Sequence, residues 1–313
     1  MSQADCSLRD TAAALGRGWN AFFHAPCDAR VCALVRIAFA CVVLANFAAL
    51  WPDRERWFTD AGVLTAETSQ RIASPYGWSL LWLLPSTTEV VNVCLWIAVA
   101  NTVLLLIGLL PRLNALCVLV WLYSFQTRNV QIIDGEDTVM RMTAFFLIWM
   151  PSGQCWSLHA LLRRWLGFPP LGCEAPGWSL RLLQIQMASI LLSTALLKLA
   201  GDEWIDGTAL YYVSRLDDFW GRFPVPAWLF DTPWTVALMT WAVLVVELTV
   251  PVLIWFKETR RWCLLVTVLF HLANEWTMHL FLFHWIMLVG WLSFLTAGDL
   301  AWFTGKSQRG AAA

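Results

Sequence analysis

The sequence predicts an all-α fold, a polytopic integral membrane bundle of about eight transmembrane helices, with seven as the alternative. Hydrophobic residues make up 59% of the 313 residues and charged residues only 14%, which is typical of an integral membrane protein and not of a soluble domain. The chain also has 22 Trp against 4 Tyr, and Trp is enriched where membrane helices meet water. The net charge of −1 gives no indication of nucleic acid as a partner, so the predicted partner is the lipid bilayer.

Long apolar runs place the individual helices. A lead over residues 1–29 carries several charges and lacks the apolar core of a signal peptide, so we expect an amphipathic or loosely ordered cytoplasmic or interfacial segment. One transmembrane domain then covers 30–303, and a short flexible tail covers 304–313. The predicted spans are 31–50, 90–110, 113–133, 138–150, 178–200 and 233–256, followed by an apolar stretch after Arg261 that holds two spans if it turns near 275–279.

Lysine and arginine are distributed unevenly between alternate loops of the eight-span arrangement. One set of loops is acidic or mixed, including 134–137 and 202–231, and the other set is basic. By the positive-inside rule, the basic set faces the cytoplasm. We therefore expect cytoplasmic N and C termini and acidic loops outside, in a bacterial cytoplasmic (inner) membrane. The basic set contains Arg9, Arg17, Arg112, Arg163, Arg164, Lys257, Arg260, Arg261, Lys306 and Arg309.

The nine cysteines indicate neither a metal site nor a redox pair, because no CxxC spacing occurs among them. Cys155 and Cys173 share one loop and could form a bridge, but the charge pattern places that loop in the reducing cytoplasm. We expect most of the cysteines to be small packing residues.

The stretch 193–215 starts in an apolar span and enters a strongly charged loop. Lys198 lies where the span ends, and an isolated ammonium at that depth must snorkel, pair or titrate. Two interpretations are open: a general base that burial favours in its neutral form, or an interfacial anchor, which is the one favoured by the residues alone. The nearest candidate partners of Lys198 are three carboxylates of this loop, Asp202, Glu203 and Asp206, and as an anchor it would reach for water or for Asp202. Trp204 and Gly207 lie in the same loop.

Other polar residues also fall within apolar runs, where each is costly without a partner. Arg128 and Asn129 end the third predicted span. Asp137 and Arg141 are four residues apart at the start of the fourth, so we expect them to pair on one helix face. Glu247 lies in the middle of the sixth span and is neutral, paired with a basic residue of another helix, or part of a functional site.

The stretch 270–284 holds three of the five histidines. His271, Glu275 and His279 are spaced four apart, which places them on one face of a helix. That face is either solvated or a site, and without an HExxH pattern we expect no metal. An acid–base or hydrogen-bonding role for His271 is favoured, because imidazole titrates near neutral pH. Asn274 lies in the same stretch.

Six segments spread over the chain carry a family resemblance. They are WFTDAGVL (57–64), RNVQIIDGEDTVMR (128–141), PSGQCWSL (151–158), KLAGDEWIDGTALYYVSR (198–215), VELTVP (246–251) and LFHLANEW (269–276). With these segments the chain resembles the HTTM (horizontally transferred transmembrane) domain family, the membrane module of the vitamin K-dependent gamma-carboxylases.

The resemblance implies chemistry at the outer face of the membrane with a reduced, vitamin K-like quinone as cofactor. Lys198 matches the lysine that acts as base toward the quinol, and His271 matches a family histidine. Asn274, Trp204, Glu247 and Asp202 are then expected to position the quinol or to tune the lysine. The chain departs from the carboxylases in having Leu197 where they have a second lysine and an acidic turn, 134–137, where they have an Asn-His pair.

Two functions from different classes follow from these expectations. The first is a quinol-dependent, carboxylase-like or oxidoreductase enzyme with a secreted or periplasmic peptide as a potential substrate. The second is a non-catalytic membrane factor that helps to mature or export a secreted peptide, or that binds lipid. In the second case Lys198 and its polar neighbours serve only to hold the helices together.

Overall fold

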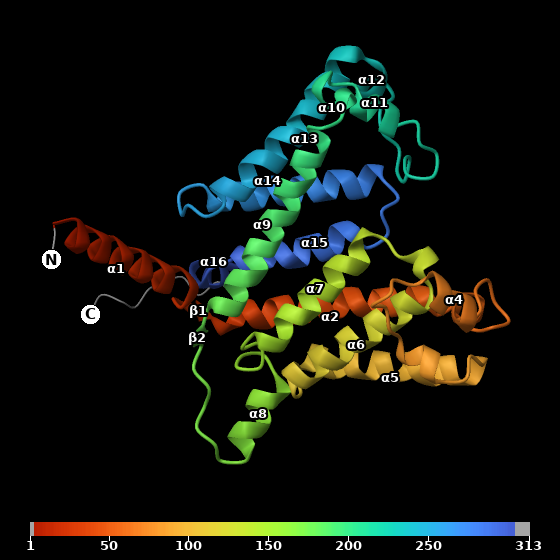
Figure 1. Cartoon of the computed structure of the whole chain (residues 1–313), viewed down its shortest axis with the longest axis horizontal. Helices are drawn as coiled ribbons and strands as arrows, with labels where there is room; N and C mark the ends of the chain where they lie inside the picture. The colour runs from red at the N-terminus through yellow and green to blue at the C-terminus, as the bar shows by residue number, and fades with distance from the viewer. Residues whose placement is uncertain (1–2, 304–313) are drawn as a thin grey trace.

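The computed structural model describes residues 3–303, and this part of the chain is mostly helical, as the sequence predicts (Figure 1). The long helices are α1 (Gln3–Phe23), α2 (Ala29–Leu50), α5 (Thr88–Ile107), α6 (Pro111–Arg128), α7 (Gly135–Trp149), α9 (Trp178–Lys198), α13 (Pro233–Leu253) and α14 (Arg260–Thr277). The shorter ones are α3 (Arg54–Phe58), α4 (Ala66–Ile72), α8 (Leu158–Trp165), α10 (Asp202–Ile205), α11 (Ala209–Val213), α12 (Trp228–Asp231), α15 (Phe283–Trp291) and α16 (Ala297–Phe303). Three 3₁₀ turns are η1 (Leu80–Leu83), η2 (Val130–Ile132) and η3 (Leu292–Phe294). The predicted tail, 304–313, lies outside the described residues.

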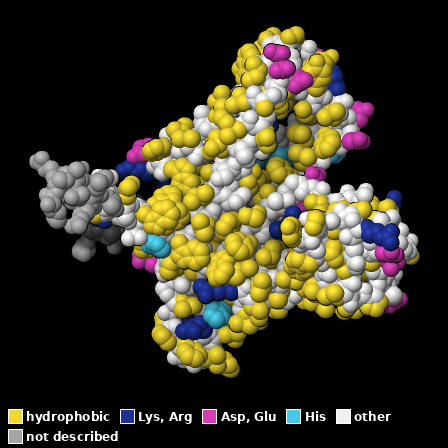
Figure 2. Space-filling model, in the orientation of Figure 1, with side chains coloured by type: hydrophobic (Ala, Val, Ile, Leu, Met, Phe, Trp, Pro, Cys, Tyr) yellow, Lys and Arg dark blue, Asp and Glu magenta, His cyan; other side chains and the backbone are white. Residues whose placement is uncertain are grey.

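Four of the described helices, α2, α5, α9 and α13, are long and apolar enough to cross a membrane. They coincide with the predicted spans that begin at residues 31, 90, 178 and 233. The other predicted spans correspond to α6, α7, α14 and α15, which are shorter or carry charge, and the total of eight stays a prediction. Hydrophobic side chains cover most of the face in Figure 2, whereas charged ones lie mainly toward its periphery. This is the surface of an integral membrane protein.

The long helices run back and forth, so the connecting segments gather at two ends of the molecule (Figure 1). One end holds α8 and the α13–α14 connection, and α1 extends away from the bundle on that side. The opposite end holds α3, α4, the short helices α10 to α12 and the α14–α15 connection. The acidic segments of the sequence therefore share one end of the bundle.

The all-α prediction missed one small element in the described residues. Strands β1 (Pro26–Asp28) and β2 (Glu174–Pro176) pair antiparallel, with Cys27 opposite Ala175. Strands of three residues cannot be recognised in the sequence, because the alternation of apolar and polar residues that indicates a strand needs at least four residues. The thiols of Cys155 and Cys173 lie 3.7 Å apart nearby, and both cysteines are free.

Local signals set the helix ends more tightly than hydropathy does. Gly108 ends α5 in the left-handed conformation, with φ of 71°, and Pro111 occupies the first turn of α6, where its missing N–H costs nothing. The third predicted span extends to residue 133, but α6 ends at Arg128 because the Asn129 side chain accepts a hydrogen bond from Gln131 N and starts η2. Asp134 then opens α7 with a capping box.

Arg36 of α2 places a charge inside the bundle that no pattern in the sequence singled out. Its side chain is fully buried. Its Nη2 donates to Trp156 O at 2.6 Å, and its Nη1 donates to Ser152 O. The guanidinium also lies against Gly108, where an added Cβ would come within 2.6 Å of Nη1. Arg36 thus faces the C-terminal ends of α5 and α7, whose partial negative charges stabilise a cation.

Candidate functional site

A cavity of about 270 Å3 lies among α9, α13, α14 and α15 near the end of the bundle that carries α10 and α11. Most of its wall is aliphatic or aromatic, as in small-molecule sites generally. Its polar lining comes from segments far apart in the sequence. Five residues that the sequence singled out line this cavity: Lys198, Trp204, Glu247, His271 and Asn274.

Lys198 and Glu247 form an ion pair across the cavity. Lys198 ends α9 and Glu247 lies in the middle of α13, and Lys198 Nζ donates to Glu247 Oε1. The two side chains are 25% and 4% exposed, respectively. The ammonium also lies 5.0 Å from the centre of the Trp204 ring, close enough for a cation–π contact. Among the alternatives for Glu247, the structure selects a pair with a lysine of another helix.

The acidic residues that follow Lys198 in the sequence are not its partners. Asp202 begins α10 with an exposed side chain and does not line the cavity, and Glu203 and Asp206 are exposed as well. The chain turns away from the end of α9 at this point, so the carboxylates nearest in sequence face solvent. Of the two residues expected to tune Lys198, Asp202 and Glu247, it is Glu247 that contacts the lysine.

Both ring nitrogens of His271 are engaged inside the bundle. Trp291 Nε1 donates to His271 Nε2 at 3.2 Å, and His271 Nδ1 lies 3.2 Å from His284 Nδ1. Since an indole nitrogen can only donate, His271 Nε2 must accept, and the proton of His271 is on Nδ1. That proton is donated to His284 Nδ1, so both rings are neutral and the proton of His284 is on Nε2.

His284 therefore presents the N–H group at the end of this chain of hydrogen bonds. Its side chain lines the cavity, only 3% of the residue is exposed, and Nε2 has no hydrogen-bond partner in the part of the chain that is described. A buried donor without a partner is costly. Of the two histidines, His284 is thus the one with an unused donor, while His271 fixes its orientation and tautomer.

The predicted row of His271, Glu275 and His279 on one helix face does not form. Helix α14 ends at Thr277, so His279 lies beyond it with an exposed side chain. Glu275 pairs with Arg222 at 2.7 Å and accepts a hydrogen bond from Trp285. Between residues 3 and 303, no group of three or more His, Cys, Asp or Glu side chains is arranged to hold a metal ion.

Arg128 and Asn129 hold the long connection between α2 and α5 in place. The fully buried Arg128 donates from Nη1 to Leu64 O at 2.9 Å and pairs with Asp60 at 3.3 Å. Asn129 Nδ2 donates to Trp57 O at 3.2 Å. Two of the segments that carry the family resemblance, 57–64 and 128–141, are thus in direct contact.

Replacing Arg128 by Met should loosen the connection between α2 and α5 without disturbing the cavity that Lys198 and His284 line. The variant leaves Leu64 O without its donor, so we expect the free energy of unfolding to fall by about 1–3 kcal/mol. Limited proteolysis should show faster cleavage between residues 53 and 87. Arg71→Met is the matched control, because Arg71 is 75% exposed and pairs with Glu67, which is 74% exposed; equal cleavage of the two variants would contradict this role of Arg128.

The expected pair of Asp137 and Arg141 is not formed. Asp137 Oδ1 instead accepts from Gln126 Nε2 at 2.7 Å, and its Oδ2 accepts from Asp134 N. Arg141 Nη2 donates to Thr138 Oγ1, and its guanidinium lies 5.5 Å from the Tyr123 ring centre. The first turn of α7 uses its carboxylates for capping, which directs Asp137 away from the next turn.

Gly207 allows the turn after α10 to pack closely on α13. Its φ is 76°, and an added Cβ would lie 3.0 Å from the Ala237 side chain and 3.1 Å from Trp241. Trp241 Nε1 in turn donates to Ile205 O. This contact holds Trp204, three residues before Gly207, at the edge of the cavity.

His284 and Trp291 belong to the site, although no pattern in the sequence singled them out. His284 lies 13 residues after His271, which is no helical spacing, and the two rings meet only because the chain reverses between α14 and α15. Trp291 was one of 22 Trp and had no local signal to separate it from interfacial ones. The sequence offered one hint: His284 had no assigned role and lies close to the predicted turn near residues 275–279.

Comparison with known proteins places the chain in a family. A relative is the uncharacterized protein YitO of Bacillus subtilis (strain 168), 29% identical over 195 residues, which are 61% of this chain and 62% of that protein. The aligned region thus spans less than two thirds of YitO. No solved structure matches the chain significantly. The model of the HTTM domain matches residues 24–298, nearly the whole chain, so this protein belongs to the HTTM domain family.

Proposed function

We propose that this protein is a membrane enzyme that uses a reduced quinone, with Lys198 as the base. The observation that carries the proposal is the meeting of the Lys198–Glu247 pair and the unpartnered His284 N–H in one apolar cavity. A basic pair and a neutral donor on the walls of one apolar cavity suit an aromatic ring with two oxygens.

The cavity fits a ring-sized head group. Its volume of about 270 Å3 is just below the range of about 300–1,000 Å3 of small-molecule pockets. The apolar wall suits the faces of an aromatic ring, and Trp204 and Phe270 offer ring surfaces for stacking. An isoprenoid tail would lie outside, among the lipid chains.

Each polar residue has a defined task in this proposal. Lys198 Nζ in its neutral form accepts the proton of a hydroxyl group, and the Glu247 carboxylate stabilises the ammonium that results. His284 Nε2 donates a hydrogen bond to an oxygen of the ring, while His271 and Trp291 are positioning residues that fix its tautomer. A reduced quinone, when bound, supplies the hydroxyl protons and two electrons, and molecular oxygen is the proposed oxidant. The exposed quarter of the Lys198 side chain offers the proton a way out to water.

The proposed location is a bacterial cytoplasmic membrane, with both termini in the cytoplasm. The positive-inside rule supports it, since the basic loops alternate with acidic ones along the chain. Three residues of the acidic segment 202–231 line the cavity: Trp204, Leu210 and Val213. The chemistry would therefore take place near the outer face.

The test is the oxidation of menadiol, a reduced naphthoquinone, by purified protein in lipid nanodiscs. Wild type should quench its Trp fluorescence on binding menadiol and consume it in air faster than protein-free nanodiscs do. Lys198→Ala should still bind but oxidise at least about 100-fold more slowly, the contribution expected of a general base. Lys257→Ala is the matched control, because Lys257 is 85% exposed and lies at the opposite end of α13; its oxidation rate should equal that of wild type.

A different result would move the protein to another class. If wild type neither binds nor oxidises menadiol and Lys198→Ala only loses thermal stability, Lys198 is a structural anchor. The proposal of an enzyme then fails. The protein would instead be a membrane factor for maturation or export of a secreted peptide, or for lipid binding.

A further inference from the structure

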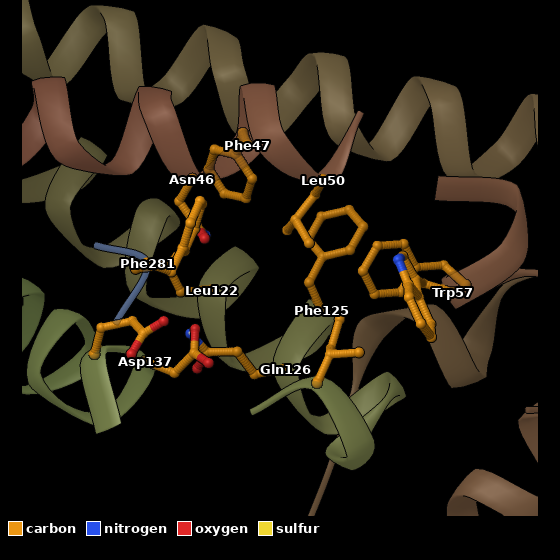
Figure 3. A pocket seen from close by; sticks show the side chains of 12 residues that line it. Asn46, Phe47, Leu50, Trp57, Leu122, Phe125, Gln126, Asp137 and Phe281 are labelled. Carbon is orange, nitrogen blue, oxygen red and sulfur yellow. The ribbon is translucent and has the colours of Figure 1, made fainter. Parts of the chain in front are cut away.

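A second cavity of about 250 Å3 lies among α2, α6 and α7, and it shares no lining residue with the first. Figure 3 shows Asn46 on one side of it and Gln126 and Asp137 on the opposite side. Glu136 is the fourth polar residue of the lining. The apolar part of the wall is largely aromatic, with Phe47, Trp57, Phe58, Phe125 and Phe281.

The contacts of Asp137 show which polar groups remain for a ligand. Both of its carboxylate oxygens already accept hydrogen bonds, from Gln126 Nε2 at 2.7 Å and from Asp134 N at 2.9 Å. Since a carboxylate only accepts, the amide of Gln126 is fixed with Nε2 toward Asp137, which leaves Oε1 for another partner. Gln126 Oε1 has no partner in the described chain, although Gln126 is only 6% exposed.

Glu136 adds a second acceptor without a counter-ion. It is 5% exposed, and no Lys, Arg or His lines the cavity among the residues that the structure describes. A buried carboxylate needs a proton or a cation to offset its lost hydration. Asn46, 6% exposed, offers a further amide oxygen across the cavity. The lining thus offers the unpartnered Gln126 Oε1 and an amide of Asn46 beside two carboxylates, those of Glu136 and Asp137.

We propose that this second cavity binds a primary ammonium group carried on a short apolar chain. An ammonium brings three donors and one positive charge, which match Glu136, Gln126 Oε1 and Asn46. The aromatic rings attract a desolvated cation through their faces and cover the apolar chain. The cavity has room for on the order of eight water molecules at about 30 Å3 each. This volume suits a short alkylamine or the side chain of a lysine in a peptide.

This site is independent of the proposed quinol chemistry, although the two cavities are neighbours. Phe281 lines the second cavity and Phe283 lines the first, so the short segment between α14 and α15 separates them. Gly135, at the start of α7, abuts this wall, and an added Cβ there would lie 3.3 Å from the Phe283 ring. Failure of one proposal therefore leaves the other standing.

The experiment measures binding of n-hexylammonium to the full chain in nanodiscs by isothermal titration at pH 7, with n-hexanol as the neutral analogue of equal shape. Wild type should bind hexylammonium at least tenfold more tightly than hexanol. Glu136→Gln should lose that difference, and Lys257→Ala should keep it, because Lys257 is 85% exposed and lines neither cavity. N-acetyl-lysine-methylamide compared with its norleucine counterpart then tells whether the site also accepts a lysine side chain of a peptide.

Two results would overturn the proposal. One is equal binding of hexylammonium and hexanol, and the other is unchanged hexylammonium binding by Glu136→Gln. If Glu136→Gln does not fold, Asn46→Leu decides, since it fills the cavity and leaves Glu136 in place. Binding that survives Asn46→Leu at wild-type affinity would locate the ammonium elsewhere.

Discussion

The variant Lys198→Met should unfold with a free energy about 3 kcal/mol below that of wild type, and Glu247→Leu added to it should recover most of this loss. Removing one member of a buried ion pair leaves the other without compensation, whereas replacing both by apolar residues of similar size is often neutral. The Glu247 side chain is only 4% exposed, so in Lys198→Met its carboxylate stays buried without a counter-ion. Denaturant unfolding followed by Trp fluorescence gives the four free energies of the cycle.

An exposed pair on the same protein provides the control for this cycle. Arg71 and Glu67 are 75% and 74% exposed, so their coupling should stay below about 1 kcal/mol. If the Lys198→Met and Glu247→Leu losses simply add in the double variant, the two side chains do not interact. A recovered double variant also supplies a stable protein without the base, which separates loss of activity from loss of folding in the menadiol experiment.

The variant Arg36→Met should be about 3–5 kcal/mol less stable than wild type, because it strips a buried network of its donor. The carbonyls of Ser152 and Trp156 would lose their hydrogen bonds, and the C-terminal ends of α5 and α7 would lose the cation that they face. Arg36→Lys should recover only part of the stability, since one ammonium cannot reproduce the forked contact with two carbonyls.

Thermal and denaturant unfolding of the purified variants measures this effect. Arg30→Met is the matched control on the same helix, because the side chain of Arg30 is 35% exposed and pairs with Asp28; its loss should stay near or below about 1 kcal/mol. If Arg36→Met lowers the free energy of unfolding no more than Arg30→Met does, the buried guanidinium stabilises the fold no more than an apolar side chain would, and the prediction is wrong.

Much of the fold could be predicted because hydrophobic burial and turn chemistry are local in sequence. The apolar runs located α2, α5, α9 and α13 to within a few residues, since a span needs about 20 consecutive apolar residues. The exact ends depended on single residues. Gly108 and Asn129 stop their helices through backbone conformation and capping, and hydropathy does not register either effect.

The candidate site could be predicted in its members but not in its pairings. Lys198, Glu247 and His271 were identified because a charged or titratable group is costly in an apolar run wherever it stands. Which partner offsets that cost depends on distances in space. The sequence suggested Asp202 for Lys198 and Arg141 for Asp137, each four residues away, and both pairings were wrong because the chain turns or caps at those points.

The sequence by itself determined that this protein is a mostly helical membrane protein of the HTTM family with a lysine at the end of an apolar span. Only the tertiary structure decided that Lys198 meets Glu247, 49 residues away, that Trp291 and His271 fix the tautomer of His284, and that Glu136 faces a cavity without a counter-ion. The physical reason is that the cost of burying a polar group depends on the residue type and its depth, whereas its compensation depends on which helices pack side by side.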